Sequence, residues 1–435
     1  MKSLIIASNK SGGGKTTFTL SLMNSLIKKG FSVQGFKVGP DYIDGAFHEF
    51  ITKKHSRNLD LFLMGTDGIN YSYSKGKSDL GVIEGVMGLY DGKGISTFAS
   101  TYHVSKELGD MPILLVITPG AQSVTLCAEI NGLKEFKNAN IVGVVLNSIS
   151  PSYYTMLKAA IEKHCNIKVF GYIPKDEKLN LKSRHLGLVQ SVEVSNLKEK
   201  IDYASKLLEE YVDIDSLVDE FKEYKAKSIK YDLEYKDIKI GVALDKAFSF
   251  YYRENIELLK QIGEIKYFSP LNDKELPKDL DFLYIGGGYP EVFKEELSKN
   301  ISMRKSIKKA LENGLRCFAE CGGLMYLTQD IDGSEMVGFF NGNAEMTTRL
   351  QRFGYSTLIL NNNEQDLIIN CHEFHKSKVN LEEETVYNIS KENYLGNKTE
   401  WVCGYKKNNT IAGYPHVNFL GNIDFFKEIV DYKKY

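Results

Sequence analysis

The stretch Ala7-Ser8-Asn9-Lys10-Ser11-Gly12-Gly13-Gly14-Lys15-Thr16-Thr17 decides the fold of the N-terminal half. It follows a β-rich apolar run over residues 3–7 and opens a helical pattern over residues 16–29. A glycine-rich turn between a strand and a helix is typical of a phosphate-binding loop, because glycine lets backbone N–H groups approach phosphate oxygens at a helix N-terminus. This segment therefore predicts a nucleotide-binding site.

The side chains of this loop predict ATP and Mg²⁺ as cofactors. Lys15 is placed to reach the β- and γ-phosphates, and the Thr16 hydroxyl is placed to ligate Mg²⁺. The strict P-loop pattern has a glycine where this chain has Asn9, and Lys10 lies five residues before Lys15, as in the deviant loops of the dethiobiotin-synthetase and partition-ATPase group. The predicted nucleotide-binding residues of the loop are Gly12, Gly13, Gly14, Lys15, Thr16 and Thr17.

The rest of the first half alternates strand-like runs with helical patterns. The runs cover residues 33–38, 81–84, 113–117, 141–146 and 168–172, with helical patterns such as 122–136 between them. Continuous apolar strands separated by helices are typical of a parallel sheet covered on both faces. The prediction is an α/β fold with a doubly wound parallel sheet, which binds ligands at the carboxyl ends of its strands.

Charged side chains extend past the end of the second strand, in the run Phe-Lys-Val-Gly-Pro-Asp-Tyr-Ile-Asp over residues 36–44. Lys37 is placed to pair with an anionic group of the substrate. Asp41, Tyr42 and Asp44 are the other predicted substrate-binding residues of this run.

Three more residues lie at the ends of later strands. Glu84 directly follows a buried run, which is the usual position of a Mg²⁺ ligand opposite the P-loop threonine, and Asp41 is the second metal candidate. Asp91 is predicted to contact substrate, although Asp-Gly is also a common turn. Asn147 is predicted to present its amide to the adenine edge, with a simple strand-end turn as the alternative.

A charged stretch without an apolar stripe divides the chain. We predict an ATP-binding domain over residues 1–212, a linker over 213–237 and a second α/β domain over 238–435. The second domain starts with the strand-like run 238–243 and changes to short strands and turns from about residue 336.

A nucleophile is predicted in the second domain at Cys321. The run Ala-Glu-Cys-Gly-Gly over residues 319–323 joins an apolar strand to a short helix, which is the geometry of a nucleophile elbow. A helix N-terminus is expected to lower the pKa of such a thiol.

The partners of this thiol are predicted from chain order. His416 lies downstream as the base, and Gly287 and Gly288 lie upstream in a loop that can offer N–H groups to an oxyanion. The order of oxyanion loop, cysteine and histidine matches class I, triad-type glutamine amidotransferases. Those enzymes usually carry a glutamate where this chain has Asn418, and an amide can still orient an imidazole.

These motifs combine with several other runs into a resemblance that spans nearly the whole chain. The other runs cover residues 56–60, 183–190, 346–350 and 372–375. In the same order, they resemble the cobyrinate a,c-diamide synthase family. The resemblance implies amidation of the a- and c-acetates of cobyrinate with ATP and L-glutamine, through acyl-phosphate intermediates. Because that substrate carries several carboxylates, the predicted basic residues of its pocket are Lys37, Arg57, Arg184 and His185.

Composition limits the partners. The net charge is −1 and no apolar run approaches a membrane span of roughly 20 residues, so nucleic acid and membrane are not expected partners. The six cysteines form no C-x-x-C pair, which favours a cytoplasmic location. The expected partners are the tetrapyrrole and glutamine, and the oligomeric state stays open.

Four alternatives remain at this point. Two use related tetrapyrroles, as hydrogenobyrinate or Ni-sirohydrochlorin a,c-diamide synthases, and a third is cobyric acid synthase, which amidates other positions. The fourth belongs to a different class: a partition-type switch ATPase whose amidotransferase domain is an inactive docking module.

Overall fold

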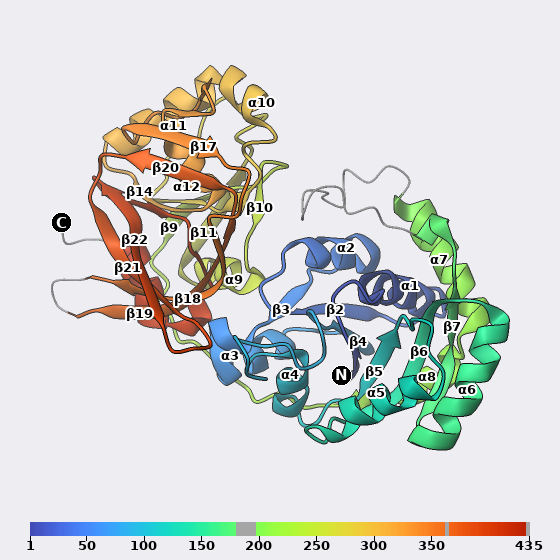
Figure 1. Ribbon diagram of the computed structural model, residues 1–435. Coiled ribbons are helices and arrows are strands. Elements are labelled where there is room, and N and C mark those ends of the chain that lie inside the picture. Colours follow the sequence, from blue (N-terminus) through green and yellow to red (C-terminus); the bar gives the residue numbers. More distant parts are fainter. Residues whose placement is uncertain (180–196, 362–364, 432–435) are drawn as a thin grey trace. The chain divides into compact units, whose positions relative to one another are not determined.

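The computed structural model describes residues 1–179, 197–361 and 365–431. It divides into two compact units (Figure 1). Unit 1 comprises Met1–Leu61 and Gly65–Lys230, and unit 2 comprises Phe62–Met64 and Tyr231–Tyr435. Both are α/β, as predicted. Within the described ranges, none of the helices is both long and apolar enough to cross a lipid bilayer.

Unit 1 is built on a sheet with the strand order β3-β2-β4-β1-β5-β6-β7. These strands are parallel, and β8 pairs antiparallel with β1. The strands are β1 (Lys2–Ala7), β2 (Val33–Val38), β3 (Arg57–Leu59), β4 (Leu80–Glu84), β5 (Ile113–Ile117), β6 (Ile141–Ile149), β7 (Lys168–Pro174) and β8 (Lys222–Glu223). The doubly wound parallel sheet is confirmed. The sequence missed β3, because its three residues form no apolar run.

The helices of unit 1 connect these strands. They are α1 (Lys15–Lys28), α2 (Ile43–Thr52), α3 (Leu61–Ser74), α4 (Thr101–Glu107), α5 (Val124–Glu135), α6 (Pro151–Cys165), α7 (Leu197–Tyr211) and α8 (Ile214–Asp219), with a short 3₁₀ turn at Glu177–Leu179. Ser100 and Ser150 cap α4 and α6 with their side-chain oxygens, which accept from backbone N–H groups. The helix α3 is broken at Gly65, whose φ of 64° is readily adopted only by glycine.

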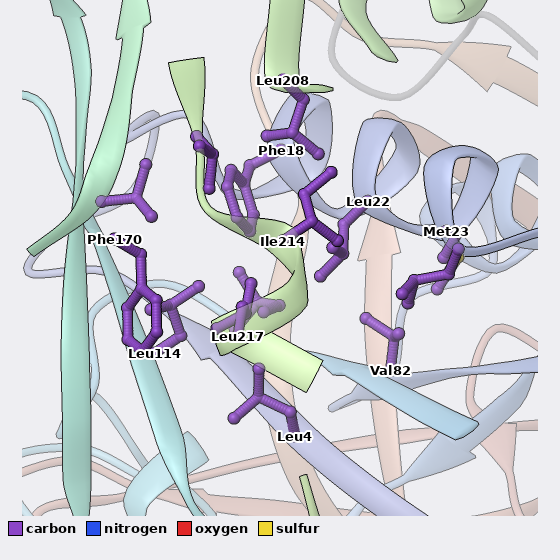
Figure 2. Packing of buried hydrophobic residues seen from close by; sticks show 14 of the residues in the cluster. Leu4, Phe18, Leu22, Met23, Val82, Leu114, Phe170, Leu208, Ile214 and Leu217 are labelled. Atoms are coloured by element: carbon purple, nitrogen blue, oxygen red, sulfur yellow. The ribbon is translucent and has the colours of Figure 1, made fainter. Parts of the chain in front are cut away.

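The core of unit 1 fixes the direction of α1 and therefore of the loop before it (Figure 2). Phe18 and Leu22 of α1 pack with Leu4 of β1, and Leu208 of α7 and Leu217 of α8 belong to the same buried cluster. At about 25 cal/mol per Å² of apolar surface removed from water, such a cluster holds the helix firmly on the sheet.

Part of the segment predicted as a linker is folded into unit 1. Residues 214–219 form α8, which has buried Ile214 and Leu217, and residues 222–223 form β8 on the edge of β1. Residues 214–219 show no clear apolar stripe that would predict a helix, because α8 is short and has only two buried side chains.

Unit 2 contains a mixed sheet with the order β11-β9-β12-β14-β23-β22-β21-β18-β19-β24. The pairs from β11 to β23 are parallel, and those from β23 to β24 are antiparallel. The strands of this sheet are β9 (Ile238–Ala243), β11 (Gly263–Phe268), β12 (Phe282–Ile285), β14 (Arg316–Glu320), β18 (Arg352–Leu360), β19 (Leu367–His375), β21 (Thr385–Glu392), β22 (Lys398–Lys407), β23 (Thr410–Gly413) and β24 (His416–Val417).

Two smaller sheets and five helices complete the described part of unit 2. The small sheets contain β10 (Phe248–Phe250) with β13 (Gly287–Gly288), and β15 (Asp330–Ile331), β16 (Ser334–Glu335), β17 (Gly342–Met346) and β20 (Ser377–Leu381). The helices are α9 (Arg253–Ile262), α10 (Lys294–Lys299), α11 (Ile301–Glu312), α12 (Gly322–Leu327) and α13 (Ile423–Asp431), with a short 3₁₀ turn at Phe419–Gly421. The shift from helices to short strands and turns near residue 336 is therefore present in the structure.

Candidate active sites

The glycine-rich loop of unit 1 joins β1 to α1. Gly12 and Gly14 have φ values of 71° and 91°, which L-residues with side chains rarely adopt. A Cβ on Gly13 would lie 2.1 Å from the Ser8 hydroxyl oxygen, so only glycine fits there. Thr17 lies in the first turn of α1. The three glycines thus leave the backbone N–H groups of residues 12–14 uncovered by side chains, as phosphate binding requires.

The Lys15 side chain folds back over this loop. Its Nζ donates to the carbonyl oxygens of Lys10 at 3.1 Å and Met87 at 2.5 Å. Burial, and next the charge of Lys37, lower the pKa of Lys15 to about 8. A phosphate bound in the loop would stabilise the charged form of Lys15 and so raise its pKa again. Lys10 contributes a backbone oxygen here.

Glu84 is the centre of a buried network at the end of β4. Its Oε1 accepts from the Thr16 hydroxyl at 2.6 Å and from Lys37 Nζ at 3.1 Å, and its Oε2 lies 2.7 Å from His48 Nε2. Burial opposes its ionisation, but the Lys37 ammonium and the hydrogen bonds from His48 and Thr16 hold the pKa of Glu84 well below its ordinary value. A carboxylate is therefore fixed beside the P-loop threonine.

Lys37 joins this network to α2. Its Nζ lies 2.5 Å from Asp44 Oδ2, and the lysine is buried. Burial alone would lower the pKa of Lys37, but the charges of Asp44 and Glu84 raise it above its ordinary value. Lys37 is therefore held as a cation beside the ionised Glu84, whereas burial and the charge of Glu84 raise the pKa of Asp44 above its ordinary value.

The other predicted residues of this edge make local contacts. Asp41 Oδ1 accepts from the N–H groups of Ile43 and Asp44 at the start of α2, next to Tyr42. Asp91 Oδ2 accepts from Gly88 N–H at 2.8 Å, as expected of turn chemistry.

Of the other basic residues predicted for the substrate pocket, only Arg57 lies in the described part of the chain. Arg57 is buried on β3 and is aligned with Phe36 of β2. Arg184 and His185 lie outside the described residues.

Asn147 lies against the P-loop at the end of β6. Its Nδ2 donates to the Thr118 hydroxyl at 2.9 Å, and the Thr118 hydroxyl donates to Gly13 O at 3.2 Å. A Cβ on Gly14 would lie 2.3 Å from Asn147 Nδ2. Asn147 is thus close to any nucleotide held by the loop.

The sequence missed His48 and Thr118 as members of this site. His48 lies four residues after Asp44 on α2, and this spacing places two helical side chains on one face. That signal was readable once α2 was assigned. Thr118 gave no comparable signal, because it reaches the loop only through the packing of β5 beside β1.

In unit 2, Cys321 forms the predicted elbow between β14 and α12. Its φ of 48° and ψ of −99° are unusual for a residue with a side chain, and its N–H donates to Gly413 O at 2.7 Å. The expectation of a lowered thiol pKa is wrong: burial raises it, and the charges of Glu291, Glu373 and Glu320 raise it further. A six-residue helix does not offset these effects.

His416 lies on β24, close to the predicted oxyanion loop. A Cβ on Gly287 would lie 2.3 Å from His416 Cε1, so the glycine leaves room for the imidazole. The His416 ring stacks on His372 of β19, with centroids 5.0 Å apart. Burial, and then the neighbouring His372 and His375, hold the pKa of His416 well below its ordinary value. The imidazole is therefore neutral and able to accept a proton.

The oxyanion loop also lies next to the elbow. A Cβ on Gly322 would lie 3.1 Å from Gly288 N, and Gly322 directly follows Cys321. Because β14 and β23 pair with Glu320 opposite Gly413, the chain reaches His416 three residues beyond this register. The oxyanion loop thus lies next to both predicted partners, with Gly288 beside the elbow and Gly287 beside His416. The catalytic use of these residues stays a prediction.

Glu320 is a member of this site that the sequence missed. It is buried beside the nucleophile, where its Oε1 accepts from Val417 N–H at 2.9 Å and its Oε2 accepts from the Tyr284 hydroxyl at 2.7 Å. Burial raises the pKa of Glu320 to about 8. By contrast, Asn418 uses its Oδ1 to accept from Leu420 N–H at 3.0 Å. The carboxyl group beside Cys321 therefore ties down the strand that carries His416.

Comparisons with known proteins match the two halves of the chain to two different family models. Residues 4–189 match the model of the CobQ/CobB/MinD/ParA nucleotide binding domain, and residues 239–423 match that of the CobB/CobQ-like glutamine amidotransferase domain. The cobyrinate a,c-diamide synthase of Clostridium tetani is 60% identical over 99% of this chain and 100% of its own. Those of Clostridium acetobutylicum and Caldanaerobacter subterraneus are 58% and 39% identical, over 99% and 98% of this chain and 100% and 97% of their own.

Proposed function

Because the chain belongs to the cobyrinate a,c-diamide synthase family, we propose that it amidates the a- and c-acetate carboxylates of cobyrinate with ATP and L-glutamine. The observation that carries the proposal is the presence of two complete sets of groups in one chain. The P-loop lies beside the Thr16–Glu84 pair, and the Cys321 elbow lies beside the oxyanion loop and His416. The first set suits phosphoryl transfer, and the second suits release of ammonia from an amide.

ATP and Mg²⁺ fit the unit 1 site. The Thr16 hydroxyl and the Glu84 carboxylate are two oxygen donors 2.6 Å apart, and Lys15 is buried in the loop. In the described part of the chain, no group of three or more His, Cys, Asp or Glu side chains is placed to hold a metal. That suits Mg²⁺, which takes one or two protein ligands and completes its shell with phosphate oxygens and water. When bound, it would neutralise the negative charge of the phosphates.

The proposed synthetase chemistry proceeds in two balanced steps. A substrate acetate oxygen attacks the γ-phosphorus of ATP, forms an acyl phosphate and displaces ADP. Ammonia then attacks the acyl carbon, loses a proton and displaces inorganic phosphate, which leaves the amide. Lys15 would bind the transferred phosphoryl group, and the cation at Lys37, held by Asp44, would attract the incoming carboxylate. Activation is needed because a free carboxylate has no adequate leaving group.

The proposed glutaminase chemistry uses the neutral pair in unit 2. The His416 imidazole takes the thiol proton as Cys321 Sγ bonds to the amide carbon of glutamine, and it returns that proton to the departing ammonia. The N–H groups of Gly287 and Gly288 would stabilise the developing oxyanion, and a Cβ on Gly322, the residue after Cys321, would lie 3.1 Å from Gly288 N. Water then cleaves the thioester and releases glutamate, which frees Cys321 for the next turnover.

Mass spectrometry of the products tests the proposal. The purified chain is incubated with ATP, Mg²⁺, glutamine and one of three substrates: cobyrinate, hydrogenobyrinate or Ni-sirohydrochlorin. We expect two amides on cobyrinate, together with one ADP and one glutamate for each amide. Amidation at four other positions would identify cobyric acid synthase activity instead. A chain that released no glutamate from glutamine would support a docking role for unit 2 and contradict the proposal.

A further inference from the structure

Unit 2 contains a cavity of about 350 Å³ between strands β18, β19, β21 and β22. Its volume is within the range of about 300–1,000 Å³ that small-molecule sites occupy. The residues that line it are Leu350, Gln351, Arg352, Phe353, Gly354, Ser356, Glu373, Lys391, Thr399 and Trp401. The cavity therefore combines one carboxylate, two cations and two aromatic rings, and no step of the proposed reaction uses any of them.

The charged groups of this cavity are held in defined positions. Glu373 is only 2% exposed, and its carboxylate accepts from Trp401 Nε1 at 3.1 Å and lies 3.0 Å from His375 Nε2. The Arg352 guanidinium lies over the Trp401 ring, 4.9 Å from its centroid. Lys391 is half-buried and donates to Phe353 O at 2.5 Å. The Glu373 carboxylate is thus fixed at the N–H of the indole ring and the Arg352 guanidinium over its face, and Lys391 belongs to the same lining.

The cavity is connected to the thiol site through β19. Glu373 and His375 point to the same face of β19 and lie 3.0 Å apart, whereas the neighbouring His372, which pairs with His416 of β24, points to the opposite face. His375 stacks on Tyr414, with ring centroids 3.7 Å apart. Tyr414 directly follows Gly413, whose carbonyl oxygen accepts from Cys321 N–H at 2.7 Å, so His375 and its partner Glu373 lie close to the nucleophile elbow. A ligand held in the cavity would therefore have one end near the nucleophile.

We propose that this cavity binds the amino-acid end of glutamine, with Glu373 receiving the α-ammonium group and Arg352, assisted by Lys391, receiving the α-carboxylate. Opposite charges beside each other match a zwitterion, and the planar guanidinium matches a carboxylate. A polycarboxylate ligand would need only the cations and would be repelled by the buried Glu373. The assignment rests on the proposed glutaminase activity, because it names the subsite that would place the glutamine amide at Cys321.

Direct binding gives the first test, because Trp401 is the only tryptophan of the chain. In a Cys321→Ser background, which cannot turn glutamine over, titration with L-glutamine should change the tryptophan fluorescence saturably. Adding Glu373→Gln or Arg352→Gln should weaken that binding about 10- to 100-fold, since each removes a charged hydrogen-bond partner. Lys378→Ala, which removes an exposed cation on β20, is the matched control and should leave the binding curve unchanged. Saturable glutamine hydrolysis without any fluorescence change would place glutamine elsewhere.

Analogues of glutamine give the second test. 4-Carbamoylbutanoate lacks the α-ammonium group, and 4-aminobutanamide lacks the α-carboxylate. In chains with Cys321 intact, we measure the ratio of kcat/KM for glutamine to that for each analogue. Glu373→Gln should lower the ratio for the first analogue alone, and Arg352→Gln should lower it for the second alone, about 10-fold or more each.

These ratios do not depend on the fraction of folded protein, so a poorly folding variant still answers the question. Ratios that stay at the wild-type values in both variants would overturn the subsite assignment while leaving the glutaminase intact. Absence of glutamine hydrolysis in the wild-type chain would instead contradict the proposed function.

Discussion

The two sites solve opposite electrostatic problems. In unit 1, Glu84 is buried against the Lys37 cation and two further hydrogen-bond partners, Thr16 and His48, and its pKa is held well below the ordinary value. In unit 2, burial dominates: it raises the pKa of the Cys321 thiol and lowers that of the His416 imidazole, so both groups are neutral. The first site is therefore charged before its ligand arrives, whereas the second separates charge only when an amide is in place. Substitutions and changes of pH should therefore act differently on the two sites, and removal of the Cys321 thiol should have the largest effect.

Cys321→Ala should separate the two sites most completely. The variant has no nucleophile, so glutamine hydrolysis should fall by at least about 10⁴-fold, as expected when a covalent catalyst is removed. Synthesis with high ammonium chloride should persist, because unit 1 keeps all its groups. Coupled ADP release and product mass measure both activities side by side. Loss of synthesis with both nitrogen sources would contradict the division of labour.

Lys15→Ala tests the charged site. Removing the ammonium should lower synthesis by about 100- to 1,000-fold with either glutamine or ammonium chloride, because the lysine is expected to stabilise the transferred phosphoryl group. Lys10→Ala is the useful comparison, since Lys10 contributes only its backbone oxygen to the contact with Lys15. Synthesis from ammonium chloride at the wild-type rate in Lys15→Ala would rule out the proposed role of the P-loop lysine.

Glu84→Gln should act on the metal requirement. The neutral amide loses the charge that faces Thr16, so the Mg²⁺ concentration for half-maximal synthesis should rise by about 10-fold or more. Asp67→Asn, which neutralises an exposed carboxylate on α3, is the matched control. A Mg²⁺ titration is sufficient. Curves that coincide for Glu84→Gln and wild type would remove Glu84 from the metal site.

The pH profile of glutamine hydrolysis should reveal the neutral pair. Because the pKa of His416 lies well below its ordinary value, the base stays deprotonated below the usual histidine value of about 6.5. The midpoint of the acid limb of kcat/KM should therefore lie well below pH 6.5. An acid limb centred at 6.5 would indicate a solvated base and would contradict the buried geometry of His416.

How much of this was readable from the sequence depended on whether the residues of a group are neighbours in the chain. The glycine-rich loop and the Cys321 elbow are continuous motifs, and the structure places both between a strand and a helix. Glu320 was invisible as a partner of Val417, because that hydrogen bond spans 97 positions and depends on the pairing of β14 with β23. The linker prediction missed α8 for a related reason, since its two apolar residues acquire a meaning only when the core of unit 1 exists.

The prediction of a lowered thiol pKa was wrong because the elbow motif shows the helix that follows Cys321 but does not show how deeply the thiol is buried. The short α12 is visible in the run of residues that follow Cys321, whereas Glu291 and Glu373 approach the thiol only in the folded unit. Local patterns thus predict which atoms react, and tertiary packing decides their charge.

Glu320→Gln should produce the smallest effect. Burial raises the pKa of Glu320 to about 8, so at pH 7 the group is mainly protonated. A glutamine has the same shape, and it can accept from Val417 N–H with its oxygen and donate to the Tyr284 hydroxyl oxygen with its amide, as the protonated acid can. Glutamine hydrolysis at pH 7 should change by less than about three-fold, since no charge is lost.

The two proteins should diverge as pH rises. A glutamic acid whose pKa is raised from 4.5 to about 8 on folding loses stability progressively between these values, and the amide does not. The thermal midpoint of the wild-type chain relative to Glu320→Gln should therefore fall from pH 5 to pH 8. Parallel midpoints across that range would mean that Glu320 is ionised in the folded chain. The Val417 strand would then be held by a charge, and the contrast between a charged and a neutral site would no longer hold.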